Sequence, residues 1–419
     1  MNHQTLKSII YDRHAIIENT EIIARDYKYE ENANYVLTGL RRSGKTIQLY
    51  SIARRLVEAG ADWNQIIFIN FEDERFADFN LKDFNDIVQV QSELSEKKGY
   101  YFFDEIQNIE GWEMFARRLA DSGERVYITG SNARMLSSDI EAKLGGRYLT
   151  KHIFPYSFQE YLAALNICFD ERALLSTRSQ GRIKNAFDEY FRYGAFPEIL
   201  GFKDKRSYVE NIFQKIQLGD IIARNNIRNV SAMRVLVKKI AETVRNEVSY
   251  SRLHSAVTSV GIRVSKDIII NYISYMEEAY LIFRLHNFVS KFAEQESSPK
   301  YYFSDNGILN LFLFEKDAAL LENLTAIKLY RQFKERVYFF KSTRTGIDVD
   351  FYIPEENTAI QVAYSLTDSS FKRETEALVS LAKGDENVRH FKIVTYEEEA
   401  SLEISGICIE VVPAYKFML

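Results

Sequence analysis

The sequence predicts an α/β fold whose first part is a doubly wound parallel sheet, and three observations carry this prediction. Short apolar runs begin near residues 35, 66, 100 and 126 and alternate with segments of helical periodicity. A loop with glycines at both ends, GLRRSGKT, joins the first run to a helical pattern. The third run, GYYFFDEIQN, ends in two carboxylates. Such alternation places helices on both faces of a parallel sheet and a ligand at the carboxyl ends of its strands.

The loop at residues 39–46 has the spacing GxxxxGK[ST], which suits a phosphate cradle. Gly39 and Gly44 allow tight turns and a close approach of backbone N–H groups to an anion, which then rests on the helix N-terminus. Lys45 is expected to reach the β- and γ-phosphates of ATP, and the Thr46 hydroxyl to hold Mg²⁺. The residues expected to contact the nucleotide are Gly39, Leu40, Arg41, Arg42, Ser43, Gly44, Lys45, Thr46 and Ile47.

The third apolar run supplies the acidic groups that such a loop requires. Four consecutive aromatic residues, 100–103, predict a strand buried on both faces, and Asp104 and Glu105 follow it directly. We expect Asp104 to bind the Mg²⁺ through water and Glu105 to orient or deprotonate the attacking water. An acidic pair at a strand end is common by itself, so its coupling to the phosphate loop is what makes it informative.

A polar turn follows the fourth run, in the stretch RVYITGSNARML. A side chain at the tip of this strand would lie beside the γ-phosphate and the attacking water. Asn132 and Ser131 are the candidates, with Asn132 assigned a catalytic role. The alternative is that TGSN forms an ordinary turn.

Length and composition limit the class of protein. A chain of 419 residues exceeds what one core usually serves, so two or three domains are expected. A hydrophobic content of 46% and a charged content of 27% are typical of a globular protein, and the net charge of −5 gives no overall attraction for nucleic acid. Two distant cysteines and the lack of a long apolar run predict a soluble, cytoplasmic protein without a membrane segment.

The motifs GLRRSGKT, NFEDER, FFDEIQN, ITGSNARML, LGGRY and FPYSFQEYL occur in this order along the chain. In this order and spacing they resemble a family of bacterial and archaeal AAA-superfamily ATPases, mostly of unknown role. The resemblance runs nearly the full length and implies an ATPase domain at 1–165, a helical region with a winged helix at 166–295, and a restriction-endonuclease-like domain at 296–419. It also implies that Arg147 is an arginine near the nucleotide, acting in cis or on a neighbouring subunit of an oligomer. A surface arginine that caps a helix is the alternative.

Residues 224–266 are locally basic, with nine Lys or Arg against two acidic residues, Glu242 and Glu247. The pattern predicts a helix at 232–245 and a last helix capped by Ser265, whose apolar face carries Ile269, Ile273, Met276 and Tyr280. In a winged helix-turn-helix, Lys266, Asn271 and Tyr275 would face a DNA groove, and Arg252 and Arg263 would lie near phosphates. A protein contact is the alternative, because Glu277 and Glu278 would repel phosphate. Arg224, just before this region, matches a family arginine that could couple nucleotide to it, although a structural salt bridge is the more ordinary interpretation.

The last part of the chain reads as a small α/β unit. The resembled nuclease fold holds Mg²⁺ with acidic residues on a helix and at a strand end, followed by Glu-x-Lys on the next strand. Glu322 and Asp350 match the first two positions, and Gln361 is a tolerable third ligand. Ala363 stands where the lysine belongs, so nuclease activity is not expected unless Lys341 or Lys372 reaches in from elsewhere. We therefore interpret this domain as inactive and useful for docking.

Two functions are compatible with these patterns. The first is a Mg-dependent ATPase whose hydrolysis drives a conformational cycle passed to the winged helix and the C-terminal domain. The second is a nucleotide-gated switch with little turnover, bound to DNA or to a protein partner. Glu105 favours the first, because a pure switch could do without a carboxylate that activates water.

Overall fold

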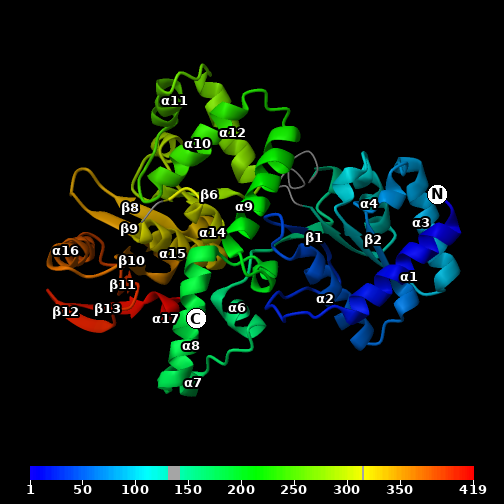
Figure 1. The fold of residues 1–419 in the computed structure, drawn as a ribbon, viewed down its shortest axis with the longest axis horizontal. Coiled ribbons are helices and arrows are strands. Elements are labelled where there is room, and N and C mark those ends of the chain that lie inside the picture. Colours follow the sequence, from blue (N-terminus) through cyan, green and yellow to red (C-terminus); the bar gives the residue numbers. More distant parts are fainter. Residues whose placement is uncertain (131–141, 314–315) are drawn as a thin grey trace. The chain divides into compact units, whose positions relative to one another are not determined.

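The computed structural model describes residues 1–130, 142–313 and 316–419. The chain divides into two compact units, Met1–Phe154 and Pro155–Leu419. Figure 1 shows their helices and strands. In the described part of the chain, no helix combines the length and the apolar character that crossing a bilayer requires.

The first unit contains a five-stranded sheet in the order β2-β3-β4-β1-β5, in which all neighbouring strands are parallel. This is the parallel α/β sheet that the sequence predicts. Strand β5, at the edge of the sheet, was not among the predicted strands. The elements of the unit are α1 (His3–Asn19), β1 (Asn34–Thr38), α2 (Lys45–Glu58), β2 (Ile66–Asn70), α3 (Phe84–Leu94), β3 (Tyr100–Asp104), α4 (Trp112–Asp121), β4 (Arg125–Thr129) and β5 (Tyr148–His152), with short 3-10 helices at Trp63–Gln65, Glu74–Phe76, Leu81–Asp83 and Ile106–Asn108.

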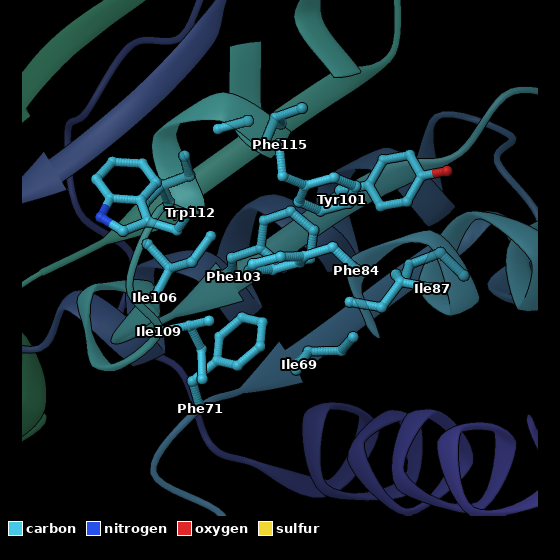
Figure 2. Packing of buried hydrophobic residues seen from close by; sticks show 14 of the residues in the cluster. Ile69, Phe71, Phe84, Ile87, Tyr101, Phe103, Ile106, Ile109, Trp112 and Phe115 are labelled. Atoms are coloured by element: carbon cyan, nitrogen blue, oxygen red, sulfur yellow. The ribbon is translucent and has the colours of Figure 1, made fainter. Parts of the chain in front are cut away.

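Alternating side chains of these strands fill a core on each face of the sheet, because successive residues of a strand point to opposite faces. Tyr101 and Phe103 of β3 pack toward α3 and α4, where the rings of Phe84 and Phe115 stack with centroids 4.4 Å apart (Figure 2). Phe102 lies in the core on the other face, which includes side chains of α2. Helices therefore cover both faces, as a doubly wound sheet requires.

The second unit is built on an eight-stranded mixed sheet in the order β12-β13-β11-β10-β9-β8-β6-β7. Strands β6 and β7 pair with each other across residue 295, where the sequence predicts a domain boundary. The division of this part into two domains remains a prediction. The strands are β6 (Ile282–Asn287), β7 (Lys300–Phe303), β8 (Tyr338–Lys341), β9 (Asp348–Ile353), β10 (Thr358–Val362), β11 (His390–Thr395), β12 (Ala400–Ile404) and β13 (Ile407–Pro413).

The helices of this unit precede the sheet in the chain, connect its strands or, in the case of α17, follow its last strand. They are α6 (Phe158–Ala164), α7 (Glu171–Leu175), α8 (Thr177–Tyr193), α9 (Lys205–Lys215), a π-helix at Ile216–Ala223, α10 (Val230–Thr243), α11 (Tyr250–Ser259), α12 (Lys266–Glu278), α13 (Phe292–Ser297), α14 (Asn306–Asn310), α15 (Asp317–Phe333), α16 (Asp368–Gly384) and α17 (Ala414–Met418), with short 3-10 helices at Pro197–Gly201, Lys334–Arg336 and Pro354–Glu356.

A buried carboxylate joins two helices of the second unit. Asp305 precedes α14 and accepts hydrogen bonds from the backbone N–H groups of Gly307 (2.9 Å), Ile308 (3.3 Å) and, beyond the end of α8, Ala195 (2.8 Å). Burial raises the pKa of Asp305 to about 6, although these three donors oppose the shift. The carboxyl group is therefore more readily protonated in the folded chain than in the unfolded chain.

This pKa predicts a pH dependence of stability. Between about pH 4 and pH 6 the folded state binds the proton more tightly than the unfolded state, so raising the pH through this range should lower the free energy of unfolding by about 3 kcal/mol. The Asp305→Asn variant keeps an oxygen acceptor for the helix and should lack this decline. Urea denaturation of both proteins at several pH values checks the prediction, and parallel pH profiles would refute it.

Candidate functional site

The loop between β1 and α2 has the backbone shape that the motif predicts. Gly39 has φ +141°, and a Cβ there would lie 2.2 Å from the carbonyl oxygen of Ile153. Gly44 has φ +96° and caps α2 without a side chain. Both positions therefore require glycine, the first because the backbone approaches closely and the second because it is left-handed. The N-terminus of α2 then opens onto the loop, which is a ready site for an anion.

Several polar groups in and beside the loop are buried. The ammonium of Lys45 is buried and donates to the carbonyl oxygens of Gly39 (3.0 Å) and Leu40 (3.1 Å). The hydroxyls of Ser43 and Thr38 are buried without a hydrogen-bond partner among the described residues. Buried polar atoms that lack a partner are costly, so they are the groups expected to bind a ligand.

Asp104 connects the acidic strand end to the loop. Its carboxylate accepts hydrogen bonds from the hydroxyls of Thr46 (2.9 Å) and Thr129 (2.5 Å). The Thr129 hydroxyl in turn accepts from the backbone N–H of Glu105 at 3.0 Å. The structure therefore brings together the predicted pair Thr46 and Asp104, and it adds Thr129, which sequence reasoning treated only as the end of a strand.

Two acidic groups of the site differ in environment. Burial and the neighbouring charge of Glu105 raise the pKa of Asp104 to about 6, while the hydrogen bonds from Thr129 and Thr46 oppose the shift. Glu105 is only partly buried and has a left-handed backbone, with φ 52°, and its carboxylate accepts a short hydrogen bond from Gln107. A non-glycine residue in this region stores strain, which is typical of functional positions.

Arg25 is a residue of the loop's surroundings that the sequence analysis missed. Its guanidinium donates to the backbone oxygens of Ser43 (3.1 Å) and Phe154 (2.7 Å) and lies over the ring of Tyr27, 5.0 Å from the centroid. It thereby fixes the phosphate loop to the chain that follows β5. Arg25 lies in an irregular segment without a motif, so no local signal could have identified it.

The hydroxyl of Thr129 should matter for stability. Thr129→Val keeps the shape but removes the donor to Asp104 and leaves the N–H of Glu105 without its acceptor, which should lower the free energy of unfolding by about 1–3 kcal/mol. Thr150→Val, on the exposed part of β5, is the matched control and should change it by less than about 0.5 kcal/mol. Equal effects in chemical denaturation would show that the hydroxyl carries no special role.

Two other predicted site residues do not join this cluster. Arg147 precedes β5, whose first residue pairs with Asn34 at the start of β1, whereas the phosphate loop follows the end of β1. It forms a short ion pair with Asp121 and donates to the carbonyl of Gly145 at 3.1 Å. Arg147 therefore lies at the amino ends of the strands, whereas the phosphate loop lies at the carboxyl end of β1, and its role near the nucleotide stays a prediction. Asn132 and Ser131 lie outside the described residues.

The donor set of the first unit fits ATP with Mg²⁺. A helix N-terminus and a lysine suit phosphate oxygens, and a hydroxyl beside a carboxylate, as in Thr46 and Asp104, suits a hard cation that keeps several waters. The hydroxyl of Ser43, which has no partner among the residues with a described structure, adds a donor inside the loop.

The basic segment of the second unit forms three helices followed by an antiparallel pair of strands, β6 and β7. Ser265 caps α12 and accepts from the N–H of Ile268, as predicted. Two details differ from the prediction: Tyr280 lies beyond the helix with φ 55°, and Arg245 lies beyond α10 with φ 88°. Each helix ends two residues before a residue with a left-handed backbone, and such a residue cannot continue a right-handed helix.

Some polar and charged side chains in and near this segment form ion pairs, and others are exposed to solvent. Glu277, expected to repel phosphate, pairs instead with the guanidinium of Arg284 at 3.1 Å, and burial raises its pKa to about 7. Arg224 pairs with the buried carboxylate of Asp220 at 3.8 Å, the structural bridge named above as its ordinary role. The exposed residues are Arg252, Arg263, Lys266 and Asn271, while Tyr275 is half-buried.

The candidate ligands of the C-terminal α/β part also lie together. Glu322 of α15, Asp350 of β9 and Gln361 of β10 line one cavity of about 790 Å³. Lys341 and Lys372 line it too, but they pair with other acidic residues, Lys341 with Glu247 and Asp348 and Lys372 with Glu376. The lysine that does contact Glu322 and Asp350 is Lys300 of β7, which the sequence analysis did not consider.

Two family models match parts of the chain. Residues 31–162 match a family model described as an AAA domain, and residues 184–319 match one described as a domain of unknown function, DUF8612. The uncharacterized protein MJ1544 of Methanocaldococcus jannaschii is 32% identical over 430 residues, which cover 99% of this chain and 95% of that protein. The chain belongs to the family of MJ1544. An uncharacterized family relative from Haemophilus influenzae is 28% identical over 380 residues, 89% of this chain and 91% of its own.

Two solved structures show a weak similarity to this member of the MJ1544 family. The Walker-type ATPase PABY2304 of Pyrococcus abyssi has a TM-score of 0.44 and 13% identity, with coverage of 71% of this chain and 99% of that one. The Aeropyrum pernix ORC1 protein in complex with DNA has a TM-score of 0.30 and 14% identity, with coverage of 77% and 94%. TM-scores this low support no inference about function. The similarity of residues 31–162 to an AAA domain therefore rests on the family model alone.

Proposed function

We propose that this protein is a Mg-dependent ATPase that passes its nucleotide state to the C-terminal unit. The observation that carries the proposal is the hydrogen bond of 2.9 Å between the Thr46 hydroxyl and the Asp104 carboxylate. It places the cation-binding group of the phosphate loop against the acidic strand end, with Glu105 as the next residue. An arrangement of this kind serves phosphoryl transfer, which needs positioning and charge stabilisation more than covalent chemistry.

The roles of the chain's own residues follow from their chemistry. Backbone N–H groups of residues 39–47 and the N-terminus of α2 bind the phosphates, and Lys45 neutralises negative charge on the β- and γ-phosphates. Thr46 and Asp104 would hold Mg²⁺, which neutralises charge that develops on the phosphate oxygens. Glu105 orients the attacking water and accepts its proton. Thr129 positions both Asp104 and the backbone of Glu105.

Duplex DNA is the proposed partner of the segment 224–266, with the helices α10, α11 and α12 and the strands β6 and β7 acting as a winged helix. Exposed Arg252, Arg263 and Lys266 support this proposal, because clustered cations supply the affinity for phosphate. The ion pair with Arg284 offsets the charge of Glu277, one of the two carboxylates that would repel DNA phosphates. A protein partner is the competing proposal, and an oligomer in which Arg147 serves a neighbouring site is a further one.

Phosphate release from ATP and Mg²⁺, measured with and without duplex DNA, tests the proposal. We expect turnover that DNA accelerates, and we expect Arg252→Glu with Arg263→Glu to remove the acceleration while basal turnover stays unchanged. If duplex DNA leaves the rate of phosphate release unchanged, a protein becomes the better candidate for the partner of residues 224–266.

A nucleotide-gated switch with little turnover is the second candidate. It predicts that nucleotide changes partner affinity whether or not Glu105 is present. The position of Glu105 beside Asp104 and Thr129 favours the ATPase.

A further inference from the structure

A buried lysine lies between two carboxylates in the second unit. The Lys300 ammonium, on β7, is 3.5 Å from an oxygen of Glu322 and 3.4 Å from an oxygen of Asp350. The side chains of Lys300 and Glu322 are 2% and 0% exposed, and they line the cavity of about 790 Å³ described above. The ammonium also lies over the ring of Phe339, 5.2 Å from its centroid. Such burial requires that the charges balance locally.

The oxygens of these carboxylates also have other donors. The Glu322 oxygen that Lys300 contacts accepts from the hydroxyl of Tyr302, and the second Glu322 oxygen accepts from Nε of Arg245, both at 2.9 Å. The second oxygen of Asp350 accepts from the backbone N–H of Val362 at 3.0 Å. Lys300 and Arg245 together carry two positive charges against the two carboxylates, so the pair of acids is neutralised.

The Mg²⁺ that the resembled nuclease fold implies does not fit this pocket. Mg²⁺ needs oxygens at about 2.0–2.1 Å, and a cation at the position of the Lys300 nitrogen would be more than an ångström too far from both carboxylates. Gln361, the expected third ligand, accepts from the N–H of Asp350 at 2.8 Å and donates to the carbonyl of Asp348 at 2.9 Å. Among the residues that the structure describes, no group of three or more His, Cys, Asp or Glu is arranged to hold a metal.

We propose that the ammonium of Lys300 is a built-in substitute for a divalent cation in this pocket, so that the native pocket takes no divalent metal. A cation added beside Lys300 and Arg245 would leave excess positive charge in a buried place, which is unfavourable. Removing the ammonium reverses the balance, because Arg245 alone then faces two carboxylates. The same pocket should therefore become a divalent-cation site when Lys300 is replaced by a neutral side chain of similar length.

Titration with Mn²⁺ in the absence of nucleotide, followed by electron paramagnetic resonance of the free ion, tests this proposal. All proteins carry Asp104→Asn, so the phosphate-loop unit contributes no cation site. Lys300→Met should bind one equivalent of Mn²⁺ at least tenfold more tightly than the unsubstituted pocket, and adding Asp350→Asn should abolish that binding. Lys341→Met is the matched control, a lysine of the same cavity that is paired with other acids, and it should create no site.

Two results would overturn the proposal. One is Mn²⁺ binding to the protein with Lys300 intact that Asp350→Asn removes. The other is a folded Lys300→Met variant, judged by circular dichroism, that gains no Mn²⁺ site. If Lys300→Met does not fold, the test rests on two proteins that keep Lys300, one with Asp350 and one with Asp350→Asn. Equal Mn²⁺ binding by these two proteins supports the proposal, because it shows that the native pocket holds no Asp350-dependent site. None of these outcomes depends on ATP hydrolysis.

Discussion

Glu105→Gln is expected to reduce phosphate release from ATP and Mg²⁺ by at least about 100-fold while leaving ATP affinity within a few-fold of the wild type. The amide keeps the size of the side chain and its contact with Gln107, but it cannot accept a proton from water. The groups assigned to phosphate and Mg²⁺ are Lys45, Thr46 and Asp104, and they are unchanged. Steady-state phosphate release and equilibrium ATP binding, measured on the same preparations, check both halves of the prediction.

Glu110→Gln is the matched control, because Glu110 is an exposed acidic residue five positions further along the same loop region. Its turnover should equal that of the wild type. If Glu105→Gln hydrolysed ATP as fast as Glu110→Gln, the carboxylate would have no role in activating water, and the switch would become the better account.

Gly194→Ala should have the largest effect on stability, a loss of about 3 kcal/mol or more. Gly194 ends α8 with φ 81° and ψ −165°, a conformation that is essentially restricted to glycine. An added Cβ would lie 2.1 Å from a carboxylate oxygen of Asp305, which is itself buried and bonded to three backbone N–H groups. The side chain cannot move away without giving up those bonds, so the joint between α8 and α14 must open.

Gly181→Ala provides the control within the same helix. Gly181 is exposed in the middle of α8, and in the described part of the chain no atom outside the helix's own backbone lies within 4 Å of an added Cβ. Alanine there should raise the free energy of unfolding by up to about 1 kcal/mol, because glycine is a poor helix former. Urea denaturation of the two variants should therefore give changes of opposite sign. A loss below about 1 kcal/mol for Gly194→Ala would mean that the joint tolerates a side chain.

Local patterns in the sequence predict much of the first unit. The apolar runs that become β1, β2, β3 and β4 are short, continuous and buried on both faces, so their type can be assigned without knowledge of the fold. Strand β5 could not be predicted in this way. Its residues, YLTKH, lie at the edge of the sheet, are partly exposed, and do not alternate regularly between apolar and polar side chains. The phosphate loop is predictable because its function depends on fixed spacing between neighbours in the chain.

The contacts that the sequence could not predict join residues far apart in the chain. Thr129 reaches Asp104 only because β4 lies beside β3 in the sheet, and Arg25 reaches Ser43 and Phe154 from an irregular segment. Lys300 is the clearest case. The resembled motif would place a lysine at the position of Ala363, but Lys300 of β7 supplies the cation that contacts Glu322 and Asp350.

The central claim is that residues 39–47, with Asp104, form the site of ATP and Mg²⁺, and equilibrium binding tests it most directly. Titration of a fluorescent ATP analogue into the wild type should give one site per chain, weakened at least tenfold by chelating Mg²⁺ and by Lys45→Ala. Arg55→Ala, an exposed cation in the last turn of the same helix, should bind as the wild type does. Absence of binding by the wild type, or equal affinity in Lys45→Ala, would contradict the account.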